Sequence, residues 1–194
     1  MEKKYKLTNE TISVDGRILH RIEALKNFGY VKKGQKGGYI ENENNLSQSG
    51  NCWVYGDAKV YDDAVIYDDA QVRHKAVVFC KAKVYGEAIV LDHAKIYDHA
   101  EVYGYAMVYD NAEIYGKTKV YGNAEIYGNA MVYGEAWVYD NAKVYDFAIV
   151  LDVAKVYGSA KVFGSTMVYD NAWVYGNAKI FGEAEVCGKA QICN

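Results

Sequence analysis

A six-residue repeat constrains this chain more than any other feature of its sequence. From Val54 to Ile192 every sixth residue is Val or Ile, at 24 successive positions. The residue that follows is Tyr or Phe in 19 of the 24 cases. The residue four places after the aliphatic one is Ala throughout, except at Thr118 and Thr166. Such a repeat indicates a stacked architecture in which each unit buries its apolar side against its neighbours.

Each six-residue unit reads as one short strand followed by one corner. Side chains alternate in a strand, so the aliphatic residue and the Ala point inward while the aromatic residue points outward. The residue two after the aliphatic one is Gly or Asp in 21 of 23 full units. Both types tolerate left-handed backbone angles at a sharp turn. Three corners close a triangular coil of three units. The repeat therefore predicts an all-β parallel β-helix, or solenoid, of about eight coils, roughly 38 Å long, with all aliphatic positions inside.

The repeat over residues 54–192 resembles the hexapeptide-repeat, left-handed β-helix superfamily, which includes trimeric acyltransferases of the lipid A type and γ-class carbonic anhydrases. Other members are non-enzymatic. The aromatic residue after the aliphatic one, and the segment GGYIENENNLSQSGNCWVYGDA, are more similar to uncharacterised tyrosine-rich hexapeptide proteins of bacteria and their phages. The resemblance implies a left-handed coil and leaves the function open.

Residues 1–50 lack the repeat and predict a small N-terminal cap, with the β-helix over residues 51–194. Within the cap, two strands joined at Val14-Asp15-Gly16-Arg17 indicate a β-hairpin. A solenoid end exposes unpaired backbone, and only the N-terminal end has spare sequence to cover it. We therefore expect the last coil, around Val186 and Ile192, to meet another copy of the chain or a partner.

Charge and composition narrow the classes of partner and location. The formal net charge is -3 and the pI is near 5.8. The chain therefore lacks the excess positive charge that binding to phosphate groups needs, and we do not expect direct nucleic-acid binding. No stretch has the apolar length of a signal peptide or a bilayer-spanning segment, so we expect a cytoplasmic protein and no membrane partner. The four cysteines lack metal-type spacing.

Catalytic chemistry has little support in the sequence. The superfamily's enzymes carry loop excursions and a histidine near a subunit boundary, whereas the frame from residue 54 to 192 holds no insertion. His93 and His99 occupy equivalent corner positions one unit apart, so they do not converge on one ion. The alternative is a metal site between subunits, in which a trimer brings His74 or His93 of one chain close to another chain. We expect no catalytic residues, no metal and no cofactor.

The outer surface is the more informative feature. Taking every eighteenth residue gives one file of seven tyrosines, with two tryptophans in the adjacent outward row. The expected binding surface is Tyr67, Tyr85, Tyr103, Tyr121, Tyr139, Tyr157, Tyr175, Trp137 and Trp173. Exposed aromatic clusters of this kind are typical of contact surfaces. The alternative is a ladder of cross-strand aromatic pairs that stabilises the fold alone.

A second outward row holds Met131, Ile149 and Met167, three apolar residues that are out of place on a solvated face. We expect this row, together with Val186 and Ile192, to form a subunit contact in a homo-oligomer. A dimer and a trimer both remain open.

Three functions fit these observations. The first is a non-catalytic protein that binds or occludes a protein partner; one form of it is a phage-encoded inhibitor acting in the host cytoplasm on a defence protein such as a CRISPR nuclease. The second is a hexapeptide-type acyltransferase or another enzyme of the superfamily, which the fold favours and the site residues do not. The third is a structural, polymer-forming or carbohydrate-contacting protein.

Overall fold

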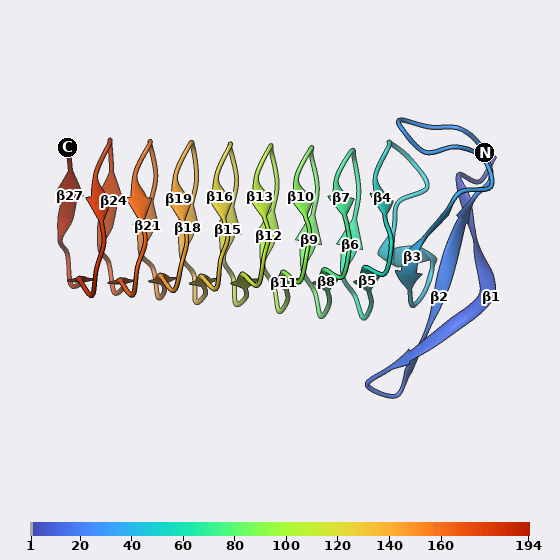
Figure 1. Cartoon of the computed structure of the whole chain (residues 1–194), viewed down its shortest axis with the longest axis horizontal. Coiled ribbons are helices and arrows are strands. Elements are labelled where there is room, and N and C mark those ends of the chain that lie inside the picture. The colour runs from blue at the N-terminus through green and yellow to red at the C-terminus, as the bar shows by residue number, and fades with distance from the viewer. Residues whose placement is uncertain (1) are drawn as a thin grey trace.

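The computed structural model describes residues 2–194 as a three-sided rod of stacked parallel strands. Figure 1 shows the chain advancing coil by coil from a hairpin at the N-terminal end to β27 at the other end. Sheets 2 and 3, defined below, have eight strands each, which corresponds to eight stacked coils. The predicted all-β solenoid of about eight coils is confirmed.

Three sheets form the sides of the rod, and each is named here by its strands. Sheet 1 contains β1 (Tyr5–Val14), β2 (Arg17–Ala24), β3 (Lys36–Ile40), β5 (Lys59–Val60), β8 (Val77–Val78), β11 (Lys95–Ile96), β14 (Glu113–Ile114), β17 (Met131–Val132), β20 (Ile149–Val150), β23 (Met167–Val168) and β26 (Glu185–Val186). Sheet 2 contains β4 (Trp53–Val54), β7 (Gln71–Val72), β10 (Ile89–Val90), β13 (Met107–Val108), β16 (Glu125–Ile126), β19 (Lys143–Val144), β22 (Lys161–Val162) and β25 (Lys179–Ile180). Sheet 3 contains β6 (Val65–Ile66), β9 (Lys83–Val84), β12 (Glu101–Val102), β15 (Lys119–Val120), β18 (Trp137–Val138), β21 (Lys155–Val156), β24 (Trp173–Tyr175) and β27 (Gln191–Cys193).

The register between coils follows directly from the repeat. Each residue pairs with the residue three repeat units farther along the chain, as Val102 pairs in parallel with Val120. Backbone N–H groups of one coil donate to carbonyls of the next, as from Tyr67 to Val84 at 3.2 Å and from Asp69 to Gly86 at 2.9 Å. Every outward side chain therefore lies directly beside its equivalent one coil away, and equal residues form files along the rod.

The core consists of the aliphatic and alanine positions. All the aliphatic positions from Val54 to Val186 are buried, with at most 8% of the residue exposed. The expectation that all 24 lie inside is wrong at Ile192, which is 37% exposed. Ile192 lies on β27, the outermost strand of sheet 3, so no further strand within residues 2–194 covers its outer side.

The corners adopt the left-handed backbone conformation expected from the Gly and Asp pattern. All 23 corner residues have positive φ, including the two exceptions, His74 at 60° and Cys80 at 57°. Aspartate adds a contact that glycine cannot make. The Oδ2 atom of Asp110, for instance, accepts a hydrogen bond from the backbone N–H of Gly128 at 3.0 Å. The carboxylate thus satisfies a donor in the next coil.

The N-terminal hairpin is present as predicted. Strands β1 and β2 pair antiparallel, with Val14 opposite Arg17 across a two-residue turn. Both turn residues have positive φ, at 50° for Asp15 and 79° for Gly16. A tight hairpin turn requires this conformation at both positions. Strand β3 pairs antiparallel with β2 and parallel with β5, so it joins the hairpin to the rod.

Parallel stacking extends N-terminal of residue 51. Ile40 pairs with Val60, and Leu46 forms a bridge with Ile66. Both pairs are spaced more widely along the chain than the pairs of later coils, because the segment 47–52 is longer than the repeat allows. This insertion hides the period from a count that starts at Val54.

Buried polar side chains satisfy backbone carbonyls of this longer segment and of the coil that follows it. The ammonium group of Lys4, only 1% exposed, donates to the carbonyls of Ser49 at 3.2 Å and Cys52 at 3.0 Å. Asn45 donates through Nδ2 to the carbonyls of Asp62 and Ala64, both at 2.9 Å. The first coil thereby finds donors for carbonyls that no preceding coil could pair.

Candidate functional site

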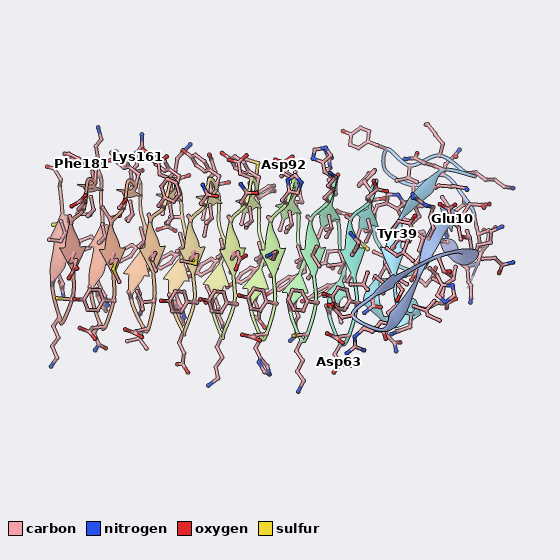
Figure 2. The ribbon with its side chains drawn as sticks, turned by 60° about the horizontal axis from the view of Figure 1, so that its bottom comes forward. Glu10, Tyr39, Asp63, Asp92, Lys161 and Phe181 are labelled. Carbon is pink, nitrogen blue, oxygen red and sulfur yellow. The ribbon has the colours of Figure 1, made fainter. Side chains whose placement is uncertain are left out.

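The predicted tyrosine file exists and is fully stacked. Along Tyr67 to Tyr175, all six neighbouring ring pairs have centroids 4.7–5.1 Å apart and planes within 7° of parallel. Figure 2 shows rings repeating along the rod at the spacing of the coils. Each ring face is therefore covered by the next ring, which leaves ring edges and hydroxyl groups towards solvent.

Similar files occupy the other two edges of the rod. Beside sheet 1 the stack is Tyr61, Phe79, Tyr97, Tyr115 and Tyr133. Beside sheet 2 the stack is Tyr109, Tyr127, Tyr145, Phe163 and Phe181. The sequence analysis missed this third file because Arg73 and Leu91 interrupt it, although the constant spacing from Tyr109 onward identifies it. Stacking on all three edges favours the ladder interpretation, and the binding role of the first file stays a prediction.

Burial raises the pKa of stacked tyrosines, as two examples show. Burial, followed by the nearby Glu125 carboxylate, raises the pKa of Tyr109 to about 12. Burial and then the neighbouring hydroxyl groups of Tyr121 and Tyr157 raise the pKa of Tyr139 to about 12. Tyr109 and Tyr139 therefore present neutral hydroxyl groups at physiological pH.

The two predicted tryptophans alternate with lysines on the outer face of sheet 3. The ammonium group of Lys155 lies 4.8 Å from the ring centroid of Trp137 and 5.0 Å from that of Trp173. The ammonium group of Lys119 lies 5.6 Å from the ring of Trp137. These cation–π contacts cover the indole rings with the chain's own cations. The contribution of Trp137 and Trp173 to binding stays a prediction.

The predicted Met131, Ile149 and Met167 row lies on the outer face of sheet 1, in adjacent strands. The coil of Ile149 adds apolar neighbours: Leu151 is the next outward residue on this face, and Phe147 and Val153 lie in the turns at its two edges. Phe147 and Val153 are 62% and 40% exposed, and Leu151 is half-buried. We call this set the apolar patch: Met131, Phe147, Ile149, Leu151, Val153 and Met167. The other two predicted contact residues, Val186 and Ile192, lie in the last coil.

A hollow of about 420 Å³ opens where the loop before β3 approaches the outer face of sheet 2. We call it the tyrosine hollow. Its lining consists of Gly29, Tyr30, Asn51, Tyr55, Asp69, Gln71, Glu87, Ile89, Tyr105 and Met107. Sequence reasoning missed this site because the cap loop and four successive coils contribute to it, and no local motif joins them.

Two tyrosines project on the borders of the tyrosine hollow. Tyr30 is 89% exposed and Tyr105 is 60% exposed, and neither is stacked on another ring within residues 2–194. Interaction with the Glu87 carboxylate raises the pKa of Tyr105. The charged lining residues are Asp69 and Glu87, both acidic. The hollow thus combines free aromatic surface, an apolar floor and negative charge.

Three of the four histidines, His74, His93 and His99, lie in turns at the corners of the rod, and His20 lies on β2. The Nδ1 atom of His74 is 2.8 Å from Oδ1 of Asp92, and both side chains are exposed. No group of three His, Cys, Asp or Glu side chains within residues 2–194 is arranged to hold a metal ion.

Within residues 2–194, no helix reaches the length and apolar character that a membrane crossing demands.

Comparison with known proteins agrees with the fold. Residues 124–140 match a family model described as the YdcK beta solenoid repeat. The chain is also similar to the "Uncharacterized acetyltransferase YdcK" of Escherichia coli (strain K12), with 38% identity over 61 residues, covering 27% of this chain. The aligned part spans 19% of the length of that relative. These matches support the resemblance to the hexapeptide-repeat β-helix proteins.

Proposed function

We propose that this protein is a non-catalytic binding scaffold that holds a protein partner at the tyrosine hollow. The observation that carries the proposal is the pair of unstacked, projecting tyrosines, Tyr30 and Tyr105. Every ring within the three files is already packed against another ring, whereas these two have free faces. Large aromatic side chains of this kind dominate the energetics of protein interfaces.

The chemistry of the hollow favours a basic side chain from the partner. Asp69 and Glu87 supply negative charge, and the tyrosine rings offer cation–π contacts to an ammonium or guanidinium group. Ile89 and Met107 provide an apolar floor, which suits the aliphatic stem of a lysine or arginine. The chain's own Arg73 already makes such a contact nearby, with its guanidinium 5.2 Å from the ring of Tyr55.

A host defence protein such as a CRISPR nuclease is a suitable class of partner. Proteins that bind nucleic acids expose many lysines and arginines for phosphate contacts, and an acidic aromatic hollow complements those side chains. A phage origin and a cytoplasmic location belong to this proposal, and the resemblance to tyrosine-rich phage proteins is what supports the origin.

Acetyl transfer is the second candidate, because the similar protein of Escherichia coli carries that name. The pair His74 and Asp92 has the arrangement of a histidine general base oriented by a carboxylate. In this alternative His74 acts on an acceptor substrate near the edge between sheets 2 and 1. The two acidic residues of the tyrosine hollow disfavour that hollow as a site for the phosphates of an acyl-CoA.

Capture from a host lysate separates the two candidates. Three immobilised proteins are compared: wild type, Tyr30→Ser with Tyr105→Ser, and the control pair Tyr121→Ser with Tyr139→Ser from the file. We expect one protein to bind wild type and the control but not the hollow variant, and no release of CoA from acetyl-CoA. Acetyl-CoA turnover that disappears in His74→Ala would support the second candidate instead.

A further inference from the structure

The outer face of sheet 1 is covered at one end by the chain's own hairpin. Leu19 of β2 is fully buried against Tyr39 and Tyr61, with Ile12 of β1 and Val77 of β8 packed around them. In Figure 1 the turn of the hairpin reaches back along the rod to the level of β5. This cover from the same chain explains why Val77 is apolar although it points outward.

Farther along the same face, the apolar patch has no such cover from residues 2–194. Phe147 and Val153 are 62% and 40% exposed, although they are large apolar residues. Between the hairpin and the patch, Lys95 and Glu113 form an ion pair of 2.9 Å, which marks a solvated stretch. The patch therefore needs an occupant whose apolar surface has a similar shape and extent.

We infer that the apolar patch binds a second copy of this chain, packed antiparallel about a two-fold axis that crosses the face beside Ile149. The sequence of the face is symmetric about that residue. Met131 and Met167 lie one coil to either side of Ile149, and Glu113 and Glu185 lie two coils to either side. A two-fold axis there places each methionine opposite the partner's other methionine.

The hairpin selects the antiparallel arrangement over a parallel one. In a parallel pair, both hairpins stand at the same level of the rod and hold the two faces apart, because each packs over Tyr61 and Val77. In the antiparallel pair, the partner's hairpin lies beyond the last described coil. The patches then meet without obstruction.

The size of the contact predicts its strength. The face spans five coils, which are spaced about 4.8 Å apart, and one side of six residues, each of which extends about 3.3 Å. Its dimensions are therefore about 24 by 20 Å, or about 480 Å² per copy. Both copies together bury about 1,000 Å², which lies at the low end for specific interfaces. We therefore expect a reversible dimer in the micromolar range.

Charge at the rim provides a test of the register. Glu113 lies opposite the partner's Glu185, with Lys95 one coil away from both. Glu185→Lys replaces two symmetric like-charge pairs by opposite-charge pairs, so the dimer should become tighter. A parallel arrangement would instead place residue 185 opposite its own copy, so one like-charge pair would replace another and association would not tighten.

Sedimentation velocity across the micromolar range tests the contact itself. Ile149→Lys should weaken the dimer about tenfold or more, because a central apolar anchor is lost. The matched control, Val65→Lys, changes an outward β-branched residue on sheet 3 and should leave the dimer unchanged. Circular dichroism checks that both variants remain folded. A wild type that stays monomeric at the highest concentration would overturn the inference.

Cross-linking tests the position of the axis independently. Cys187 and Cys193 are exposed and are first replaced by Ser to remove competing thiols. In that background Ile149→Cys should form a covalent dimer under mild oxidation, because residue 149 faces its own copy across the axis. Val65→Cys, the control, should not. Absence of the 149 cross-link, or no tightening by Glu185→Lys, would contradict the antiparallel register.

Discussion

The rings of Tyr121 and Tyr139 stack with their centroids 4.9 Å apart and their planes 2° from parallel. This separation is close to the distance between neighbouring strands in a sheet, about 4.8 Å. The backbone therefore sets the ring spacing, and the rings add cross-strand contacts without any distortion of the coil. The same relationship holds on all three edges, so the files act first as continuous ladders that stabilise the rod.

Interrupting the ladder should lower stability without unfolding the protein. Tyr121→Ser with Tyr139→Ser removes stacking at the centre of the file and should lower the free energy of unfolding by about 1–2 kcal/mol. Urea denaturation measures the change. A loss as large as that from a core substitution would show that these rings are structural core and not surface ladders.

The inward positions respond differently from the outward ones. Val120 is fully buried, and Val120→Asp should prevent folding, because an unpaired carboxylate would lie in an apolar site. The adjacent Lys119→Asp points outward and should be tolerated, with a small loss from its contact with Trp137. Circular dichroism and soluble yield compare the two. A folded Val120→Asp protein would contradict the assignment of the core.

Much of the fold could be predicted because one physical rule repeats. Strand alternation and coil closure place each aliphatic residue inside, and Asp15-Gly16 identifies the hairpin turn. The start of parallel stacking at Ile40 and Leu46 could not be predicted from the repeat, since the insertion in the segment 47–52 breaks the spacing. The burial of Lys4 also depends on that segment, whose carbonyls it satisfies.

Two separate effects determine how a substitution at a corner aspartate changes stability: the backbone conformation and the side-chain hydrogen bond. Asp110 has φ of 57° and accepts the N–H of Gly128. Asp110→Asn should be nearly neutral, because asparagine tolerates this conformation and its amide oxygen accepts the same bond. Asp110→Gly should cost about 1 kcal/mol from the lost hydrogen bond.

Asp110→Val completes the series and should be the least stable of the three variants. A β-branched residue adds roughly 1–2 kcal/mol of left-handed strain to the lost hydrogen bond. Thermal unfolding of the three proteins gives the order. Equal stability of the Gly and Val variants would show that the corner does not impose the left-handed conformation.

Alkaline pH should destabilise the protein through its tyrosines. Burial first, and then neighbouring groups, raise the pKa of Tyr61, Tyr109 and Tyr139 to about 12 in the folded state. In the unfolded chain the pKa of tyrosine is about 10. Below pH 10 both states keep these protons, so the stability is fully present. As the pH rises from about 10 to about 12 the unfolded chain loses them first, and stability falls.

One group acts in the opposite direction. Burial lowers the pKa of Lys4, so its contribution to stability increases as the pH rises towards the unfolded value. Many stacked tyrosines outweigh one lysine. Tyrosinate absorbance and urea midpoints measured at alkaline pH report the sum. A midpoint that rises over the range in which tyrosine ionises would contradict the burial of the tyrosine hydroxyl groups.

The candidate site was less predictable than the fold. Outward files follow from the constant spacing of the coils, and the Met131, Ile149 and Met167 row was visible in the sequence. Phe147 and Val153 adjoin the same patch only because they lie in the turns at the two edges of this face, on either side of Ile149. The tyrosine hollow depends on how the cap loop folds back over sheet 2, which brings together Tyr30 and Tyr105 from distant parts of the sequence.

The affinity of the captured partner for the hollow variant tests the central claim most directly. Calorimetry compares wild type, Tyr30→Ser with Tyr105→Ser, and the file control Tyr121→Ser with Tyr139→Ser, using the purified partner. The account predicts a loss of at least about tenfold in the hollow variant, equal to about 1.4 kcal/mol, and unchanged affinity in the control. Unchanged affinity in the hollow variant, with a loss in the file control, would contradict the account and assign binding to the tyrosine file.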